Sequence, residues 1–84
     1  MKKNSTNKKF IYLISPNKIK NYNFFTNLDL LLKTRKVNFF QLRLKNETKK
    51  NKLLIGRKIK KICKKYKVKF LVNDDPRLAK KLNA

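Results

Sequence analysis

Val37-Asn38-Phe39-Phe40-Gln41-Leu42-Arg43-Leu44-Lys45 is a stretch in which an apolar run passes into polar side chains at every second position. In an extended strand, successive side chains point to opposite faces. Gln41, Arg43 and Lys45 therefore share one face, and the apolar residues between them share the other. A strand buried on both faces would not carry this polar triplet unless its end opened onto a ligand. We expect a buried strand with a ligand site at its end.

The same pattern, an apolar run followed by polar residues, occurs three times in the chain. The runs cover residues 9–15, 37–43 and 68–74. Their starts are separated by about 30 residues, which suits a strand, a crossover helix and two short loops. We expect three parallel strands near residues 10–14, 38–43 and 69–73. The first should be buried and should stop at Ser15 and Pro16.

A chain of 84 residues is long enough for one domain at most. A parallel sheet needs helices on both faces or closure into a barrel, so three strand-helix units leave an open edge with unpaired strand groups. We therefore expect residues 9–84 to form part of a larger domain. Residues 1–8 are polar and basic, and we interpret them as a disordered lead-in.

Apolar residues at helical spacing predict a helix after each strand. The expected inner face of the first helix is formed by Phe24, Phe25, Leu28, Leu31 and Leu32. The second helix, which Asn46 or Thr48 can cap, should run to about Tyr66. Its expected apolar stripe is formed by Ile55, Ile59, Ile62, Cys63 and Tyr66. The third helix should cover residues 77–82, with Asp75 as its cap and Pro76 in its first turn.

The formal net charge of +21 would normally point to nucleic acid or an anionic membrane. Here Lys supplies nearly all of the charge and is spread along the chain, whereas base and phosphate recognition favours the guanidinium of Arg. The lysines outside the apolar stripe of the second helix are Lys58, Lys60, Lys61, Lys64 and Lys65. We interpret them as a solvated outer face. Any nucleic-acid binding should be salt-sensitive and independent of sequence.

The cysteine and histidine content bears on the cellular compartment and on the chemistry available to the protein. Cys63 is the only cysteine, so no intrachain disulfide can form, and the cytoplasm is the expected compartment. Its place in the second helix indicates a core residue rather than a reactive thiol. Histidine, the commonest general base and metal ligand, is absent. The apolar run at residues 10–14 is too short for a signal peptide or a membrane span.

The three predicted strands all end in charged or hydrogen-bonding residues. In parallel α/β folds, ligands bind beyond the carboxyl ends of the strands. Arg43 and Lys45 would offer donors to a phosphate-type anion, and Asp74 would hold a cation such as Mg²⁺ against it. The combination indicates a diphosphate site.

At these residues the chain resembles the thiamine phosphate synthase family, whose members are (β/α)₈ barrel enzymes. Family members carry Leu-Tyr-Leu-Ile in the first strand, Gln-Leu-Arg-Glu-Lys after the second, and Asn-Asp-Arg at the end of the third. The corresponding segments here are Ile11-Tyr12-Leu13-Ile14, Gln41-Leu42-Arg43-Leu44-Lys45 and Asn73-Asp74-Asp75. The resemblance covers residues 10–84. It implies an α/β fold that holds the first three βα units of a TIM (β/α)₈ barrel.

The resemblance also implies roles for these residues. The substrate-binding set would be Gln41, Leu42, Arg43, Leu44, Lys45 and Asn73, in contact with 4-amino-5-hydroxymethyl-2-methylpyrimidine diphosphate. Asp74 would bind Mg²⁺. The implied reaction transfers the pyrimidine methylene to the nitrogen of a thiazole phosphate and releases diphosphate. It needs stabilisation of leaving-group charge more than a protein base, so we assign no catalytic acid or base.

Two residues depart from the family pattern. Leu44 replaces the usual Glu on the face opposite Arg43, where we expect a change in packing. Asp75 replaces the usual Arg and could disturb the local field at Asp74. The family continues beyond position 84 with a second metal-binding Asp and the thiazole phosphate site. We therefore expect at most half an active site in this chain and no activity from it alone.

Two alternatives remain open at the level of sequence. A thiazole tautomerase or regulator barrel of the same superfamily does not need the full diphosphate set, so the presence of Arg43, Lys45, Asn73 and Asp74 together favours the synthase. A basic RNA-binding module rests on charge alone, because the chain lacks the paired sheet-face aromatics or glycine loops of such modules. The sequence predicts small-molecule substrates, no specific nucleic acid and no membrane partner, and it leaves the oligomeric state open.

Overall fold

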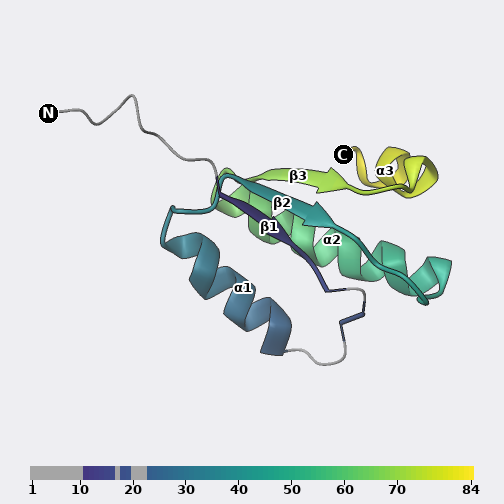
Figure 1. Ribbon diagram of the computed structural model, residues 1–84, viewed down its shortest axis with the longest axis horizontal. Coiled ribbons are helices and arrows are strands. Elements are labelled where there is room, and N and C mark those ends of the chain that lie inside the picture. The colour runs from purple at the N-terminus through teal and green to yellow at the C-terminus, as the bar shows by residue number, and fades with distance from the viewer. Residues whose placement is uncertain (1–10, 17, 20–22) are drawn as a thin grey trace, which may run out of the picture.

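Three β-strands and three α-helices alternate along the chain. The computed structural model describes residues 11–16, 18–19 and 23–84. Its elements are β1 (Tyr12–Ile14), α1 (Asn23–Lys33), β2 (Phe39–Leu42), α2 (Lys49–Lys65), β3 (Lys69–Val72) and α3 (Pro76–Leu82) (Figure 1). The predicted order of three strand-helix units is confirmed. The expected lead-in at residues 1–8 lies outside the described residues.

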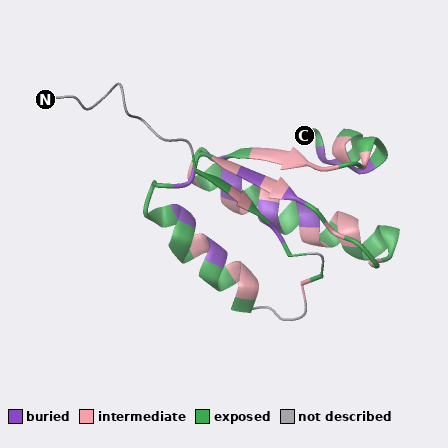
Figure 2. Ribbon diagram, viewed as in Figure 1, coloured by how far each residue is buried: buried purple, intermediate pink, exposed green. Residues whose placement is uncertain are grey.

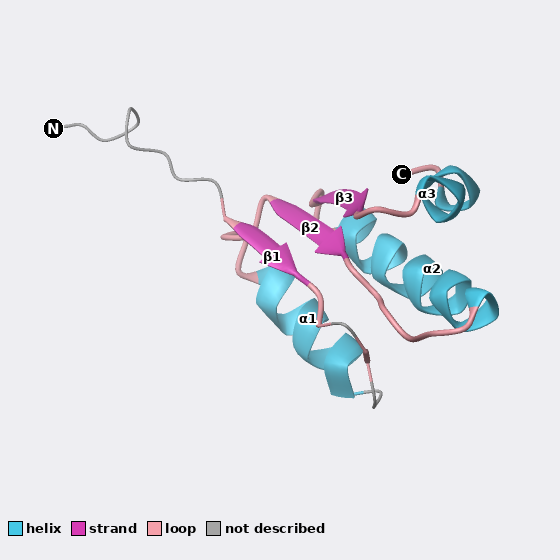
Figure 3. Cartoon of the chain, turned by 45° about the vertical axis from the view of Figure 1, so that its right-hand side comes forward, coloured by secondary structure: helices cyan, strands magenta, loops and turns pink. Residues whose placement is uncertain are grey.

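The strands form one parallel sheet in the order β1-β2-β3. Leu13 pairs with Phe40, which in turn pairs with Phe70, so side chains of the same face line up across the sheet. Helices α1 and α2 lie against one face of this sheet, and α3 lies beside α2 (Figure 3). Because each helix returns the chain to the start of the next strand, the carboxyl ends of all three strands meet at one edge.

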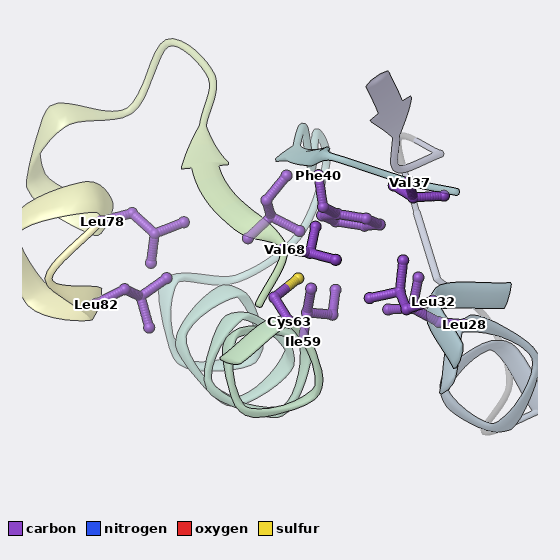
Figure 4. Close-up of a cluster of buried hydrophobic side chains, with 10 residues drawn as sticks. Leu28, Leu32, Val37, Phe40, Ile59, Cys63, Val68, Leu78 and Leu82 are labelled. Atoms are coloured by element: carbon purple, nitrogen blue, oxygen red, sulfur yellow. The ribbon is translucent and has the colours of Figure 1, made fainter. Parts of the chain in front are cut away.

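The core lies between the sheet and the helices (Figure 4). Its buried residues are Leu28, Leu32, Val37, Phe40, Leu42, Ile59, Cys63, Val68, Leu78 and Leu82. Buried positions fall on the sides of the helices that face the sheet, as the helical spacing predicts (Figure 2). Cys63 is fully buried, and burial raises the pKa of its thiol to about 12, so the predicted core role is confirmed.

The only glycine, Gly56, lies buried where α2 meets α3. A Cβ atom at this position would lie 2.5 Å from Leu82 Cδ1 and 3.4 Å from Leu42 Cδ2. The absence of a side chain therefore allows α3 to approach α2 closely, at the helix-propensity cost that glycine carries.

Local capping signals place the helix starts. Thr48, not Asn46, caps α2, because its Oγ1 accepts a hydrogen bond of 3.1 Å from the backbone N–H of Asn51. The carboxylate of Asp75 accepts a 3.1 Å bond from the N–H of Leu78 and caps α3, with Pro76 in the first turn as predicted. No helix in the described part of the chain is long and apolar enough to cross a membrane.

The prediction that the first strand is buried is wrong. Ile11, Tyr12 and Ile14 are 44%, 59% and 53% exposed, and only Leu13 packs against the core. The physical reason is that β1 is the outermost strand on one side of the sheet. No described residue covers β1 on the sheet face opposite the helices (Figure 3). The ring of Tyr12 stacks on Phe39 of β2 at 4.5 Å between centroids.

The predicted inner face of α1 needs one correction. Leu28 and Leu32 are buried, and Phe24 and Phe25 are half-buried, but Leu31 is 42% exposed. Leu28 and Leu32 are four residues apart and stack in one line toward the sheet, whereas Leu31 is rotated away from that line. The apolar stripe of α1 is therefore narrower than its sequence indicates.

Candidate functional site

Hydrogen bonds between neighbouring strands fix the carboxyl edge of the sheet. The N–H of Ser15, after β1, donates to the carbonyl of Gln41 at 3.0 Å, and the Ser15 hydroxyl accepts from the N–H of Arg43 at 2.8 Å. The N–H of Asn73, after β3, donates to the carbonyl of Leu42 at 2.9 Å. Ser15 is buried, and these bonds give partners to both its backbone N–H and its hydroxyl oxygen. The first residues beyond all three strands are thus held in register.

A chain of side-chain hydrogen bonds runs along this edge from β2 to the residues after β3. The amide nitrogen of Gln41 donates to Oδ1 of Asn73 at 2.7 Å, and the amide nitrogen of Asn73 donates to Oδ2 of Asp74 at 3.1 Å. Both ends of the Asn73 amide are therefore used, which fixes its orientation. Asp74 lies in the left-handed region, with φ at 52°, and its side chain is exposed. These bonds orient the Asp74 carboxylate.

A pocket of about 310 Å³ lies at the same edge. We call it the candidate pocket, and its lining residues are Arg43, Leu44, Lys45, Asn46, Lys52, Asn73, Asp74 and Asp75. Five of the seven residues predicted from the sequence line it directly, although they come from segments about 30 positions apart. Gln41 joins them through its hydrogen bond to Asn73. Arg43 and Lys45 are exposed, so their donors are accessible to a ligand.

Leu42 is the predicted site residue that the structure does not bring to the pocket. Its side chain is only 1% exposed and belongs to the core, because the strand alternation turns it toward the helices. Only its backbone contributes to the edge, through the carbonyl that accepts from Asn73. A side-chain role for Leu42 in ligand binding is therefore wrong.

The two residues that depart from the family pattern, Leu44 and Asp75, make different kinds of contact. Leu44 is half-buried, packs against the core and also lines the candidate pocket, and the expected change in packing relative to the family's Glu stays a prediction. Asp75 caps α3, and its other oxygen lies 3.6 Å from the ammonium group of Lys52. Its negative charge is thus partly balanced within the pocket.

Lys52 is a pocket residue that the sequence analysis missed. It lies near the start of α2, and its side chain is 24% exposed. Lysine is so common in this chain that the residue type alone does not mark a pocket position. Its position could have revealed it, because the first turns of a helix that follows a parallel strand lie near the carboxyl edge of the sheet.

The described residues contain no group of three His, Cys, Asp or Glu side chains that could hold a metal by themselves. The donor set does fit Mg²⁺ in its usual form, which uses one or two carboxylates and completes the shell with water and ligand phosphates. Asp74 is exposed at the pocket and already oriented by Asn73. Arg43 and Lys45 lie in the same lining and could hold the phosphates.

Parallel strand-helix units with polar residues beyond the strand ends define an α/β protein with a pocket at the carboxyl edge of its sheet, the place where folds of this class bind ligands. Within this class, the chain belongs to the thiamine monophosphate synthase family, whose model matches residues 11–84. The resemblance inferred from the motifs is therefore confirmed.

Two relatives support the assignment. The thiamine-phosphate synthase of Pelagibacter ubique is 69% identical over 84 residues, which is all of this chain and 41% of the relative. That of Flavobacterium johnsoniae is 39% identical over 46 residues, which is 55% of this chain and 22% of the relative. The chain thus spans less than half the length of these relatives. No solved structure matches it significantly.

Proposed function

We propose that this chain supplies the pyrimidine diphosphate half of a thiamine phosphate synthase active site. The enzyme would join 4-amino-5-hydroxymethyl-2-methylpyrimidine diphosphate to a thiazole phosphate and release diphosphate. The observation that carries the proposal is the convergence of Arg43, Lys45, Asn73 and Asp74 on one pocket at the carboxyl edge of the sheet. The family membership and the synthase names of both relatives support it.

The residues assigned to the substrate and the metal have roles that follow from their chemistry. Arg43 and Lys45 donate charge-assisted hydrogen bonds to the diphosphate. Gln41 and Asn73, which are joined by a hydrogen bond between their amides, would contact the pyrimidine, and Asn73 also orients Asp74. Asp74 would hold Mg²⁺, which neutralises charge on the departing diphosphate. The pocket needs no histidine, because these residues bind and orient the substrate and stabilise negative charge.

We propose further that the three units are the start of a (β/α)₈ barrel, in a cytoplasmic enzyme. Among the described residues, β1 and β3 each leave one sheet edge unpaired and β1 is exposed on the face opposite the helices, so strands and side chains from elsewhere would cover them. The relatives contain the additional length, since this chain covers 41% of the Pelagibacter protein. That remainder would close the barrel and supply the thiazole phosphate site. Without it, the chain should be marginally folded and inactive, because like charges at +21 also oppose compaction.

A chimera tests this proposal. Residues 1–84 of this chain, followed by the part of the Pelagibacter relative that lies beyond the match, would restore a family-length protein. We expect this chimera to form thiamine phosphate from the two substrates in the presence of Mg²⁺, and the 84-residue chain to form none. Turnover by the purified 84-residue chain would refute the half-site argument. A folded chimera that binds neither substrate would refute the assigned function.

A further inference from the structure

A row of cationic side chains runs along the outer side of α2, away from the candidate pocket. Arg57 and Lys61 are four residues apart, as are Lys60 and Lys64, so these four side chains share one face of the helix. Together with α3 they line a hollow of about 410 Å³, which we call the α2–α3 groove. Its lining residues are Arg57, Lys60, Lys61, Lys64, Lys81, Leu82 and Asn83. None of these lines the candidate pocket.

None of the described residues that line the α2–α3 groove is acidic, and the four acids of the chain have other places. Asp29 is paired with Lys65, Asp75 with Lys52, Asp74 bonds to Asn73, and Glu47 accepts from the amide of Asn51. The neighbouring hollow near the start of α2 also carries lysines, but it contains the Lys52–Asp75 pair. The described lining of the α2–α3 groove therefore combines five cations with no acidic side chain.

Like charges at this spacing destabilise a helix. The folded chain nevertheless holds both walls of the groove in place. The ammonium group of Lys60 donates to the carbonyl of Leu82 at 2.6 Å, and the side chain of Leu82 is buried against Gly56 of α2. The groove is thus preformed, and an anion that entered it would relieve repulsion without requiring the helices to move.

We propose that the α2–α3 groove binds the phosphate backbone of nucleic acid. The four cations on α2 span seven residue steps, which is about 10 Å along the helix axis, so they can face more than one phosphate. In the described part of the chain no aromatic side chain lines the groove, and lysine predominates over arginine, so the contact involves phosphates and not bases. Binding is therefore independent of sequence. This site is separate from the proposed synthase site and does not depend on it.

Two variants with the same net charge test whether the oligonucleotide binds at the α2–α3 groove or anywhere on the basic surface. Lys61→Gln/Lys64→Gln/Lys81→Gln removes three lysines of the groove, and Lys33→Gln/Lys36→Gln/Lys50→Gln removes three exposed lysines elsewhere. Each variant lowers the net charge of residues 1–84, which is +21, by three. Binding of a fluorescein-labelled 12-nucleotide oligo(dT) to the family-length chimera, with or without these substitutions in residues 1–84, would be followed by anisotropy over a range of salt concentrations, and circular dichroism would verify folding.

We expect the groove variant to bind at least about tenfold more weakly at 0.1 M salt, and its salt slope to be shallower by about 2, as the loss of three phosphate contacts implies. The control variant should change affinity by less than about threefold, because net charge alone acts weakly at a distance through salt. Equal losses in both variants would overturn the proposal, as would the absence of binding by the unaltered chimera.

A second measurement needs no variant. Lysine acetylation of the unaltered chimera, read by mass spectrometry, reports which ammonium groups the oligonucleotide covers. We expect Lys61, Lys64 and Lys81 to be protected several-fold more than Lys33 and Lys36. Uniform protection would overturn the proposal. Protection by inorganic polyphosphate but not by oligo(dT) would also overturn it, since the ligand would then be a different polyanion.

Discussion

The two ends of the sheet carry the same kinds of side chain but use them differently. Near the amino ends, Asp29, Arg35, Lys65 and Tyr66 form what we call the amino-end cluster, in which the side chains bind one another. Lys65 pairs with Asp29 at 3.1 Å, the Tyr66 hydroxyl donates to Asp29 at 3.0 Å, and Arg35 donates to the Tyr66 carbonyl at 3.2 Å. At the carboxyl edge, the charged groups of Arg43, Lys45 and Asp74 remain exposed at a pocket.

We infer from this difference that the amino-end cluster serves stability and that the carboxyl edge serves the proposed function. In the amino-end cluster, each charge has its partner within the chain, and Arg35 also lies 5.4 Å from the centroid of the Tyr66 ring. The hydrogen bonds from Lys65 and Tyr66 lower the pKa of Asp29, and the bond to Asp29 raises the pKa of Lys65. At the carboxyl edge, the strands hold three charged groups close together without pairing them with one another. A phosphate group bound together with a metal ion would give partners of opposite charge to all three groups.

The largest expected effect is at Asp74. In the chimera, Asp74→Asn should lower Mg²⁺-dependent turnover by at least about a hundredfold, because a carboxylate that helps to neutralise leaving-group charge is worth several kcal/mol. Thermal stability should barely change, since Asp74 is exposed. Steady-state kinetics with a Mg²⁺ titration would measure the effect. Lys61→Ala, on the outer side of α2, is the control and should retain activity. An active Asp74→Asn variant would refute the metal role.

Arg43→Ala should have the next largest effect. Loss of charge-assisted hydrogen bonds of about 1.5–3 kcal/mol would weaken binding of the pyrimidine diphosphate by roughly ten- to a hundredfold. Calorimetric titration of the chimera with this substrate would measure it. Lys36→Ala removes an exposed cation at the amino end and serves as the control. Equal losses in the two variants would show that general charge, and not the pocket, attracts the substrate.

Tyr66→Phe probes the amino-end cluster. The change removes the hydroxyl that donates to Asp29 and keeps the ring that lies beside Arg35. We expect the free energy of unfolding of the chimera to fall by about 1 kcal/mol, with turnover per folded molecule unchanged. Denaturant titration alongside kinetics would measure both. A loss of specific activity with unchanged stability would contradict the division between the two ends.

The smallest effect concerns the pH dependence of Asp29. Its folded-state pKa lies below the ordinary value of 3.8, so its contribution to stability is complete above that value and is lost as the pH falls through the folded-state pKa. Asp29→Asn should therefore lower the melting temperature at neutral pH, and the difference from the unaltered protein should shrink in acid. High salt should reduce it too, because the pair is exposed. A difference that grows in acid would contradict the assignment.

Periodicity and local hydrogen bonding determined much of this protein from the sequence alone. The three strand-helix units follow from apolar runs of strand and helix period, and the caps at Thr48 and Asp75 follow from side chains that bond their own helix. The site residues Arg43, Lys45, Asn73 and Asp74 could be placed together because parallel strands must end at the same edge. All of these depend on interactions that are short in sequence or imposed by the topology.

Only the tertiary structure decided which distant side chains meet and which apolar residues are covered. Lys52 reaches Asp75, and Asp29 reaches Lys65 and Tyr66, through the packing of α2 against its neighbours, and no periodicity in the chain marks these partners. Tyr12 and Ile14 read as buried from their apolar character, but they are exposed because β1 lies at the sheet edge. Burial depends on what lies opposite a residue in space, and a local pattern records only which residues can share a face.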